Sequence, residues 1–364
     1  MAIPPIDLAG QYQRLQPEIE TAVKRVLERG WYILGEEVQA FEAEFAAFIG
    51  VSYGVGVASG TAALTLALQA VGVTPGDEVI TVSHTAVATV AAIEQAGAYP
   101  VFVDIDPATF TMNPKHLEAA ISARTQAIVP VHLYGHPADM EPILAIARQH
   151  ALAVVEDCAQ AHGACYQGQM VGAFGDAAAF SFYPTKNLGA AGDGGLVATN
   201  RADVADKVRQ LRQYGWGERY ISQVRGYNSR LDELQAAILR VKLGYLATWN
   251  EQRRRWAAAY TRLLAHSDLK TPEAVGDVSH VYHLYVARSQ QRDQLLAHLR
   301  QQGIMAQIHY PVPVHLQPAY ADLGYRPGSL PETERAAQTV LSLPLYPELN
   351  QKQIEDVVEA IQRR

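Results

Sequence analysis

Short apolar runs alternate with helix-like patterns through the first two-thirds of the chain. Seven runs have the length and composition of buried strands, and they lie at 53–58, 78–82, 100–105, 127–132, 152–157, 177–182 and 194–199. Apolar residues recur at helical spacing at 61–71, 85–96 and 138–150, and Asn113 followed by Pro114 opens a further helix toward Ile121. Strands that alternate with helices predict an α/β fold with a mostly parallel seven-stranded sheet, covered by helices on both faces.

The last third of the chain has a different pattern. Residues 230–266 have the spacing of one long helix, which is long enough to bridge two domains. After it come a strand within 281–287 and helices near 291–302 and 351–362. We therefore predict a large domain over residues 1–249 and a smaller C-terminal α/β domain over 250–364.

Composition narrows the class of protein. The 364 residues are 49% hydrophobic and carry a net charge of -7, with no block of like charges, which argues against nucleic acid or an anionic membrane as the main partner. The N-terminal residues lack the pattern of a secretory signal, and no apolar stretch is long enough to span a bilayer. Cys158 and Cys165 have no Cys/His cluster at metal-ligand spacing. We therefore expect a cytoplasmic protein with reduced thiols and no metal site.

Candidate chemistry lies where the predicted strands end, because ligands of open parallel sheets bind at the carboxyl ends of strands. Ser59, Gly60 and Thr61 follow the first strand and would begin a helix, where free backbone N–H groups favour a phosphate. An ordinary helix cap is an equally good interpretation of this segment alone. The chain has no GxxxxGK[ST] loop, and the glycines of "GVGVASG" have the wrong spacing for a nicotinamide-binding fingerprint.

Two further residues lie near this candidate phosphate-binding site. Asp157 ends the strand predicted at 152–157, and Lys186 lies between another strand and a glycine-rich turn. Pyridoxal phosphate needs a lysine to hold it, a carboxylate against its ring nitrogen and a phosphate site, and the chain offers all three at strand ends. Lys186 would hold the cofactor and then move the substrate proton. Ser181 could add a hydroxyl to the phosphate, and His84 could stack on the ring, although a satisfied loop histidine is as good an interpretation.

Ordered sequence blocks extend this pattern over nearly the whole chain, and they include "ASGTAAL", "PGDEVITVSHTAVAT", "VVEDCAQAHGA", "SFYPTKNLGAAGDGG" and "GYNSRLDELQAAIL". Together they resemble the DegT/DnrJ family of nucleotide-sugar aminotransferases, which are fold type I pyridoxal-phosphate enzymes. The resemblance implies that Lys186 is the Schiff-base lysine and that Asp157 faces the pyridine nitrogen. It assigns the phenolic oxygen of the cofactor to Gln160 and the face of its ring to His84.

The same resemblance assigns the cofactor phosphate to two sets of residues. Gly60, Thr61 and Ser181 match phosphate ligands from the same chain. Asn228 matches a phosphate ligand from the neighbouring subunit, which implies a homodimer with shared active sites.

The resemblance also bears on the reaction and the substrate. Relatives with histidine in place of the lysine act as dehydratases on deoxysugars, so Lys186 implies transamination. The stretches that begin at Tyr214 and Ile308 resemble the branch that aminates dTDP-linked 3-keto-6-deoxyhexoses, and L-glutamate is the expected donor on family grounds. The residues that match positions near the sugar or its diphosphate are Tyr183, Arg219, His309 and Tyr310.

Alternatives remain open at this point. The acceptor could be a 4-keto sugar, or an inosose or aminoshikimate-type ketone. A non-catalytic relative that kept the fold is a different class of hypothesis, and the intact residues Lys186, Asp157, Gln160 and Asn228 argue against it. His309 and Tyr310 could also do no more than shape a turn before Pro313.

Overall fold

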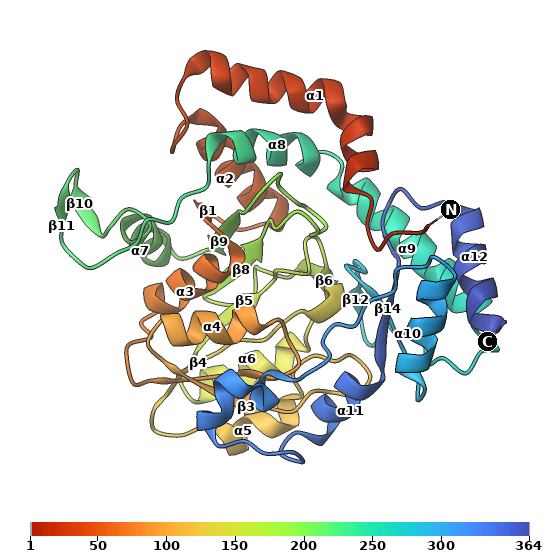
Figure 1. Ribbon diagram of the computed structural model, residues 1–364. Helices are drawn as coiled ribbons and strands as arrows, with labels where there is room; N and C mark the ends of the chain where they lie inside the picture. The colour runs from red at the N-terminus through yellow and green to blue at the C-terminus, as the bar shows by residue number, and fades with distance from the viewer. Residues whose placement is uncertain (1, 364) are drawn as a thin grey trace.

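The computed structural model describes residues 2–363 and is built around one seven-stranded sheet (Figure 1). Its strands are β1 (Tyr53–Val57), β2 (Glu78–Val82), β3 (Tyr99–Val103), β4 (Thr125–Ile128), β5 (Ala153–Asp157), β8 (Ala177–Ser181) and β9 (Gly195–Thr199). They are ordered β1-β9-β8-β5-β4-β2-β3, and only β9 is antiparallel to its neighbours. The mostly parallel seven-stranded sheet predicted from the sequence is therefore confirmed.

Helices cover both faces of this sheet. On one face lie α3 (Gly60–Ala70), α4 (Val87–Gln95) and α7 (Ala202–Leu211), and on the other lie α2 (Glu36–Ile49) and α8 (Glu233–Leu243). In β8, Ala177 and Ala179 pack into the first layer, whereas Ala178 and Phe180 pack into the second. This alternation follows from the two-residue period of a strand, and it explains why the strand sequence is apolar throughout.

Further helices and a small sheet complete the part of the chain before residue 280. Asn113 caps the short helix at Pro114 by accepting a hydrogen bond from the Lys115 N–H, as the sequence predicts. The other helices are α1 (Leu8–Arg29), α5 (Leu117–Ala120) and α6 (Met140–Gln149), and a small sheet is formed by β6 (Cys165–Tyr166), β7 (Gln169–Met170) and β12 (Val278–Ser279).

A second hydrophobic core is formed mainly by the C-terminal part of the chain, near both chain ends (Figure 1). Trp256, Tyr260 and Tyr285 are among its buried side chains, and Ile3 from the N-terminal segment joins them. The elements that contribute to this core are α9 (Leu246–Leu263), β13 (Tyr285–Arg288), α10 (Arg292–Gln301), β14 (Val340–Leu343) and α12 (Gln351–Gln362). Helix α11 (Pro331–Thr339) instead packs its Ala336 against residues of β2 and β4. The domain boundary between residues 249 and 250 stays a prediction.

The single long helix expected over residues 230–266 is wrong. The structure has two helices, α8 and α9, which are separated at Gly244 and Tyr245. Glycine lowers helix propensity by about 1 kcal/mol relative to alanine, so a break there costs little. The break lets α8 cover the sheet while α9 contributes Trp256 and Tyr260 to the second core.

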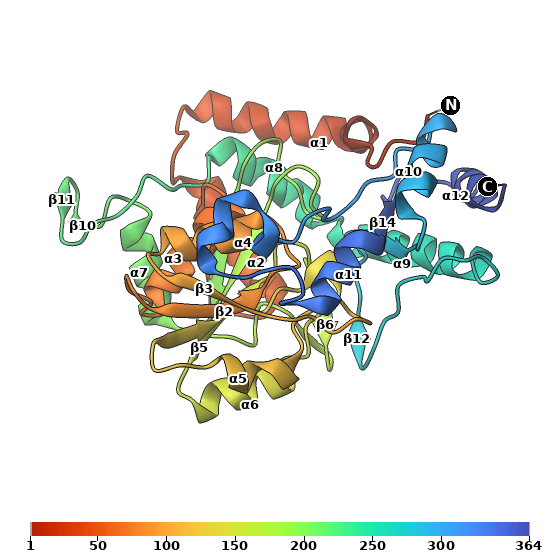
Figure 2. The same cartoon turned by 60° about the horizontal axis from the view of Figure 1, so that its bottom comes forward.

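A two-stranded arm projects from the body of the chain (Figures 1 and 2). It consists of β10 (Trp216–Glu218) and β11 (Ile221–Ser222), and its tip carries Arg219 and the exposed Tyr220. Among the described residues, no helix is both long and apolar enough to cross a membrane.

Candidate active site

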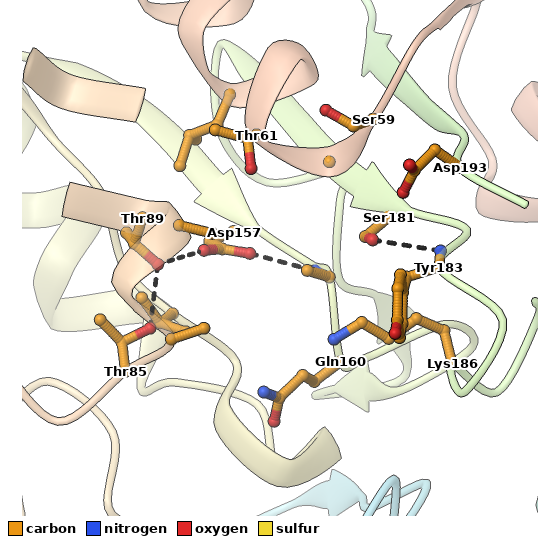
Figure 3. A pocket seen from close by; sticks show the side chains of 16 residues that line it. Ser59, Thr61, Thr85, Thr89, Asp157, Gln160, Ser181, Tyr183, Lys186 and Asp193 are labelled. Atoms are coloured by element: carbon orange, nitrogen blue, oxygen red, sulfur yellow. Dashed lines mark hydrogen bonds between the residues drawn. The ribbon is translucent and has the colours of Figure 1, made fainter. Parts of the chain in front are cut away.

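A cavity of about 240 Å³ lies at the carboxyl ends of β1, β5 and β8 (Figure 3). Its position is the one that an open parallel sheet offers to ligands. Eight of the residues singled out in the sequence line it, namely Ser59, Gly60, Thr61, Asp157, Gln160, Ser181, Tyr183 and Lys186. The structure thus brings together residues that lie up to 127 positions apart in the sequence, from Ser59 to Lys186.

One end of the cavity is the N-terminus of α3. The Ser59 hydroxyl caps this helix by accepting a hydrogen bond from the Ala62 N–H at 3.1 Å. The N–H groups of Gly60 and Thr61, the first two residues of the helix, have no acceptor within the helix. A Cβ atom at Gly60 would lie 2.5 Å from the Ser181 Cβ, so only glycine lets the helix end approach the Ser181 hydroxyl. This end combines backbone donors, a hydroxyl and the positive end of a helix dipole, which suits a phosphate.

Asp157 forms the floor of the cavity at the end of β5 (Figure 3). Its side chain is buried, and each oxygen accepts one hydrogen bond. Oδ1 accepts from the Ala159 N–H at 3.1 Å, and Oδ2 accepts from the Thr89 hydroxyl at 2.8 Å. The remaining lone pairs are available to a cationic group inside the cavity, such as a protonated ring nitrogen.

Lys186 reaches into the cavity with an amino group that has no hydrogen-bond or ion-pair partner among the described residues. Burial lowers the pKa of Lys186 to about 8, and the charge of Asp157 opposes this shift. Burial and the Lys186 charge also lower the pKa of His162 to about 3 and the pKa of His309 to about 4. These imidazoles therefore stay neutral near pH 7 and do not add positive charge beside the amine.

The residue after the lysine ties this loop to the rest of the molecule. The Asn187 amide donates to the Asn250 side chain at 2.9 Å and to the Val281 carbonyl at 3.1 Å. Its oxygen lies 3.1 Å from Nδ1 of His283, and Asn250 in turn donates to the His162 carbonyl. Because Asn187 is buried and fully hydrogen-bonded, the backbone that carries Lys186 is held in one position.

Gln160 links the cavity to the C-terminal region. Its Oε1 accepts a hydrogen bond from the Tyr134 N–H at 2.7 Å, and its Nε2 donates to the Tyr310 hydroxyl at 3.0 Å. Burial raises the pKa of Tyr310 to about 12, so this hydroxyl keeps its proton. One amide N–H of Gln160 remains available to a ligand in the cavity.

His84 does not line the cavity, and the stacking role expected for it stays a prediction. His84 is buried behind the wall of the cavity, where its ring packs against Phe110 and Tyr134, and Thr85 and Ala86 line the wall instead. Tyr134 donates its hydroxyl hydrogen to the His309 carbonyl, so Nε2 of His84 donates to the Tyr134 oxygen at 2.8 Å. Burial lowers the pKa of His84 to about 4. Only one nitrogen of the ring is bonded, because Nδ1 of His84 is buried and has no hydrogen-bond partner among the described residues.

Four other expected site residues do not line the cavity of their own chain, and one of them, Tyr310, is bound to the lining residue Gln160. Arg219 lies at the tip of the arm, where its guanidinium packs over the Tyr220 ring. Asn228 is exposed at the base of the arm and forms a backbone bridge with Gln213. His309 bonds to the Ser342 hydroxyl at 2.8 Å through Nδ1.

Three polar residues of the cavity wall were not predicted from the sequence, namely Thr85, Thr89 and Asp193. In the helix predicted at 85–96, Thr85 and Thr89 stand four positions apart on one face, although α4 begins only at Val87. That spacing, just after a strand end, was the available signal. Asp193 lies within the glycine-rich turn after Lys186, and nothing in its local pattern distinguishes it.

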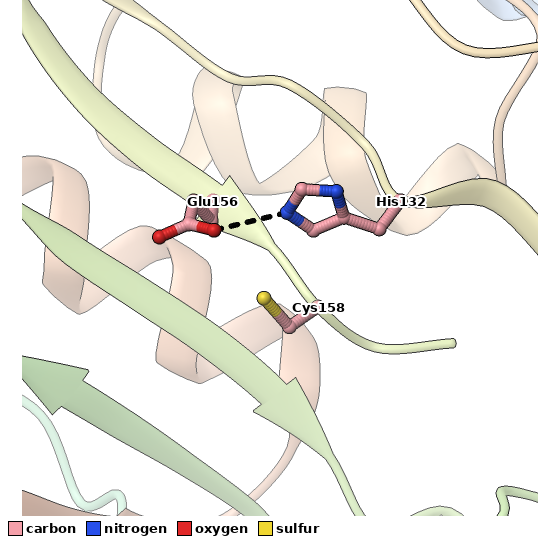
Figure 4. A group of neighbouring side chains, drawn as sticks. All are labelled: His132, Glu156 and Cys158. Carbon is pink, nitrogen blue, oxygen red and sulfur yellow. Dashed lines mark hydrogen bonds and ion pairs between the residues drawn. The ribbon is translucent and has the colours of Figure 1, made fainter. Parts of the chain in front are cut away.

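A second buried group of potential ligands lies next to the cavity, where His132, Glu156 and Cys158 have ligand atoms within 4.8 Å of one another (Figure 4). All four hydrogen bonds to the Glu156 carboxylate come from the protein, from His132 Nε2 and from the N–H groups of Gly172, Phe174 and Gly175. His132 Nδ1 accepts from the Ala138 N–H, and burial raises the pKa of the Cys158 thiol. A cation would have to displace these bonds, so the group fits a structural role.

Comparison with known proteins gives a consistent result over the whole chain. The model of the DegT/DnrJ/EryC1/StrS aminotransferase family matches residues 13–362. A protein of Geobacillus stearothermophilus named "Pleiotropic regulatory protein" is 52% identical, over 99% of this chain and 98% of its own. The dTDP-3-amino-3,4,6-trideoxy-alpha-D-glucose transaminase of Streptomyces venezuelae is 48% identical, over 99% and 95%. The crystal structure of S. venezuelae DesV in complex with a ketimine intermediate superposes with a TM-score of 0.97 at 47% identity, over 100% of this chain and 98% of the other.

Proposed function

Because the chain belongs to the DegT/DnrJ/EryC1/StrS aminotransferase family, which uses pyridoxal phosphate, we propose that it aminates the 3-keto carbon of a dTDP-linked 6-deoxyhexose. L-Glutamate is the proposed amino donor. The observation that carries this proposal is the unpartnered amino group of Lys186, which shares one cavity with Asp157 and with the α3 N-terminus. The acceptor is inferred from the relative that is named as a dTDP-3-amino-sugar transaminase.

The donor set of the cavity fits pyridoxal phosphate. Bound there, the cofactor supplies an electron sink for the bond that breaks at the substrate carbon. In this proposal the N–H groups of Gly60 and Thr61 and the Ser181 hydroxyl bind its phosphate. Asp157 faces its ring nitrogen and keeps that nitrogen protonated, and the free N–H of Gln160 faces its phenolic oxygen.

Lys186 has two tasks in the proposed reaction. Its Nζ first holds the cofactor, and after a substrate amine displaces it, the same nitrogen moves the proton at the substrate carbon. With a pKa of about 8, about a tenth of the free amine is neutral at pH 7, whereas an ordinary lysine would be almost wholly charged. The loop hydrogen bonds of Asn187 keep this nitrogen within the cavity while it is free.

The substrate side of the cavity is proposed from Tyr183 and Tyr310. Tyr183 lines the cavity with a half-exposed ring, and Tyr310 is bound to Gln160. Both present hydroxyl groups from which a sugar can receive hydrogen bonds. His309 is held by Ser342 and contributes its carbonyl to Tyr134, so its proposed role near the sugar is through the position of Tyr310.

We further propose a homodimer in which the arm completes the site of the partner. Two observations support this proposal. Asn228 and Arg219 are exposed and do not line the cavity of their own chain, and the arm also carries the exposed aromatic residues Tyr214, Tyr220 and Tyr227. In this arrangement Asn228 binds the cofactor phosphate of the partner, and the Arg219 guanidinium binds the diphosphate of the sugar nucleotide. A cytoplasmic location fits the two free cysteines.

Two competing functions remain to be separated by experiment. A 4-keto sugar or a cyclitol ketone would use the same cofactor residues, so only the acceptor distinguishes them. A non-catalytic regulator is the other class, and one relative carries the name of a regulatory protein. A regulator has no need of a lysine whose amine is kept unpartnered and whose pKa is lowered by burial.

The test begins with the visible absorbance of the purified protein before and after L-glutamate. We expect a yellow band that bleaches on addition of the donor, and a protein that stays colourless with added pyridoxal phosphate would contradict the role of Lys186. The amino form is then offered dTDP-3-keto-6-deoxyglucose, its 4-keto isomer and the UDP-linked 3-keto sugar. Return of the yellow band with the 3-keto dTDP sugar alone supports the proposed acceptor. A response to the 4-keto isomer alone overturns it.

A further inference from the structure

We propose that Thr89, supported by Thr85, is a positioning residue that fixes the carboxylate of Asp157 for the ring nitrogen of the cofactor. The inference rests on the proposed assignment of Asp157 to that nitrogen. Thr89 and Thr85 act through Asp157 in this proposal, without taking part in the proton transfer themselves.

Two hydrogen bonds join Thr85, Thr89 and Asp157 in a chain (Figure 3), and chemistry fixes their direction. The Thr89 hydroxyl lies 2.8 Å from Asp157 Oδ2, and a carboxylate can only accept, so the hydrogen of Thr89 is committed to Asp157. The Thr85 and Thr89 hydroxyl oxygens lie 2.9 Å apart, so Thr85 must donate to Thr89. The result is a relay from Thr85 through Thr89 to Asp157, in which each bond polarises the next.

Thr89 is the third residue of α4, so the residue four positions earlier, Thr85, precedes the helix. A threonine farther inside a helix commonly bonds back to the main-chain carbonyl four residues earlier, as Thr65 does to Thr61 and Thr339 does to Arg335 in this chain. Thr89 in α4 instead bonds to the side chain of the residue four positions earlier and to a carboxylate on β5. Its hydroxyl therefore joins two elements at the cavity rather than closing a local helical bond.

Among the described residues, both hydrogen-bond donors to the Asp157 carboxylate are uncharged. The Ala159 N–H fixes Oδ1 and the Thr89 hydroxyl fixes Oδ2, and no ion pair with an arginine or lysine is present within salt-bridge distance. A carboxylate held at both oxygens cannot rotate about its last bond, so its remaining lone pairs keep one direction. Removing Thr89 would free Oδ2, and the carboxylate could then turn away from the ring nitrogen.

The experiment compares Thr89→Val, Thr89→Ser and Thr85→Val in the complete protein. Valine keeps the shape of threonine and removes the hydroxyl, whereas serine keeps the hydroxyl. Thr81→Val is the matched control, because the Thr81 hydroxyl is also buried but donates to the Val129 carbonyl at 3.0 Å, outside the cavity. The readouts are the dissociation constant of pyridoxal phosphate, from fluorescence titration of the apoprotein, and the pH at which the absorption band of the bound cofactor changes. Steady-state kcat and KM follow for the folded variants.

For Thr89→Val we expect about 10- to 100-fold weaker cofactor binding, from loss of a hydrogen bond to a charged group. The pH of the absorption change should move, and kcat should fall while KM for the sugar nucleotide stays within about 3-fold. Thr85→Val should move the same readouts in the same direction by less, and Thr89→Ser should restore them. The proposal is overturned if Thr89→Val behaves as Thr81→Val does in both cofactor readouts.

Two further outcomes are decided by additional variants. Asp157→Asn separates this proposal from the assignment on which it rests: if it alone changes the readouts, the relay fails and the assignment stands. If neither Asp157→Asn nor Thr89→Val changes them, the assignment itself is wrong. Should Thr89→Val not fold, Thr85→Val decides, because unchanged cofactor readouts in that variant contradict a relay through Thr89.

Discussion

Glu156 and Asp157 are neighbours at the end of β5, and their carboxylates lie on opposite faces of the strand in opposite kinds of surroundings. Glu156 is saturated by three backbone N–H groups and by His132, so it has nothing left to offer a ligand. Asp157 accepts from Thr89 and Ala159 and keeps lone pairs that face the cavity. One step along the strand thus separates a carboxylate that holds a loop from one that can serve a cofactor.

Exchanging each carboxylate for its amide should separate these roles. Glu156→Gln puts an NH₂ group against N–H donors, so we expect a loss of at least about 3 kcal/mol in the free energy of unfolding. Denaturant unfolding of the two variants checks this, with Asp157→Asn as the matched change at the next position. A Glu156→Gln protein as stable as the wild type would contradict the structural role of the group around His132.

The catalytic assignments predict large kinetic effects. Lys186→Ala should abolish turnover, since no other amine lines the cavity among the described residues. Asp157→Asn should lower kcat by at least about 100-fold, because the charge that keeps the ring nitrogen protonated is gone. Single-turnover absorbance with L-glutamate measures both variants. Near wild-type rates in either one would remove that residue from its proposed role.

Stability of the apoprotein should depend on pH through Lys186. Its folded pKa of about 8 lies below the ordinary lysine value of 10.5, so burial of the charged form destabilises the fold fully below about pH 8. Between the two values the unfolded state binds more protons, and the penalty disappears as pH rises. Lys186→Met should therefore be more stable than the wild type at pH 7, by up to about 3 kcal/mol, an upper bound because part of the side chain stays exposed in the cavity.

The measurement for this prediction is the difference in unfolding free energy between Lys186→Met and the wild type at pH 7 and at pH 10.5. The difference between variants isolates Lys186 from Lys242, whose pKa burial also lowers to about 8. A gap that does not narrow as the pH rises would show that packing, rather than charge, sets it.

Shared active sites predict complementation between two defective chains. Lys186→Ala removes the amine of one cavity, and Asn228→Asp places a negative charge where the proposed partner phosphate binds. A heterodimer of the two would contain one intact site, so random mixing should restore about a quarter of wild-type activity. Dissociation and reassembly of the mixed variants, followed by an activity assay, is the test, and each variant reassembled alone is the control. Mixed dimers without activity would argue that each chain forms its own complete site.

The sequence predicted most of what depends on local periodicity and on strand ends. Asp157 and Lys186 could be placed at one edge of the sheet because each follows an apolar run, and parallel strands end at a common edge. His84 also follows such a run, but the direction of a side chain after a strand depends on the path of the loop. That path turns His84 toward Tyr134 and brings Ala86 to the cavity.

Other features depend on contacts between distant elements. The Thr89 bond to Asp157 joins α4 to β5, and a threonine carries no local signal of such a partner. The break between α8 and α9 follows from which core each helix faces, and the apolar pattern continues across it. The arm keeps Arg219 and Asn228 away from their own cavity, so only the family resemblance could suggest them.

The hydrogen bonds of Asn187 bear on which part of the chain can act alone. A chain that ends at residue 249 would keep every residue that lines the cavity, yet it would lose Asn250, Val281 and His283, the three partners of Asn187. A buried amide without partners costs about 1–3 kcal/mol for each polar group. The loop that carries Lys186 would therefore be the first segment to lose its ordered conformation. Retention of the cofactor is therefore a property of both halves of the molecule, although the residues that would touch the cofactor come from one.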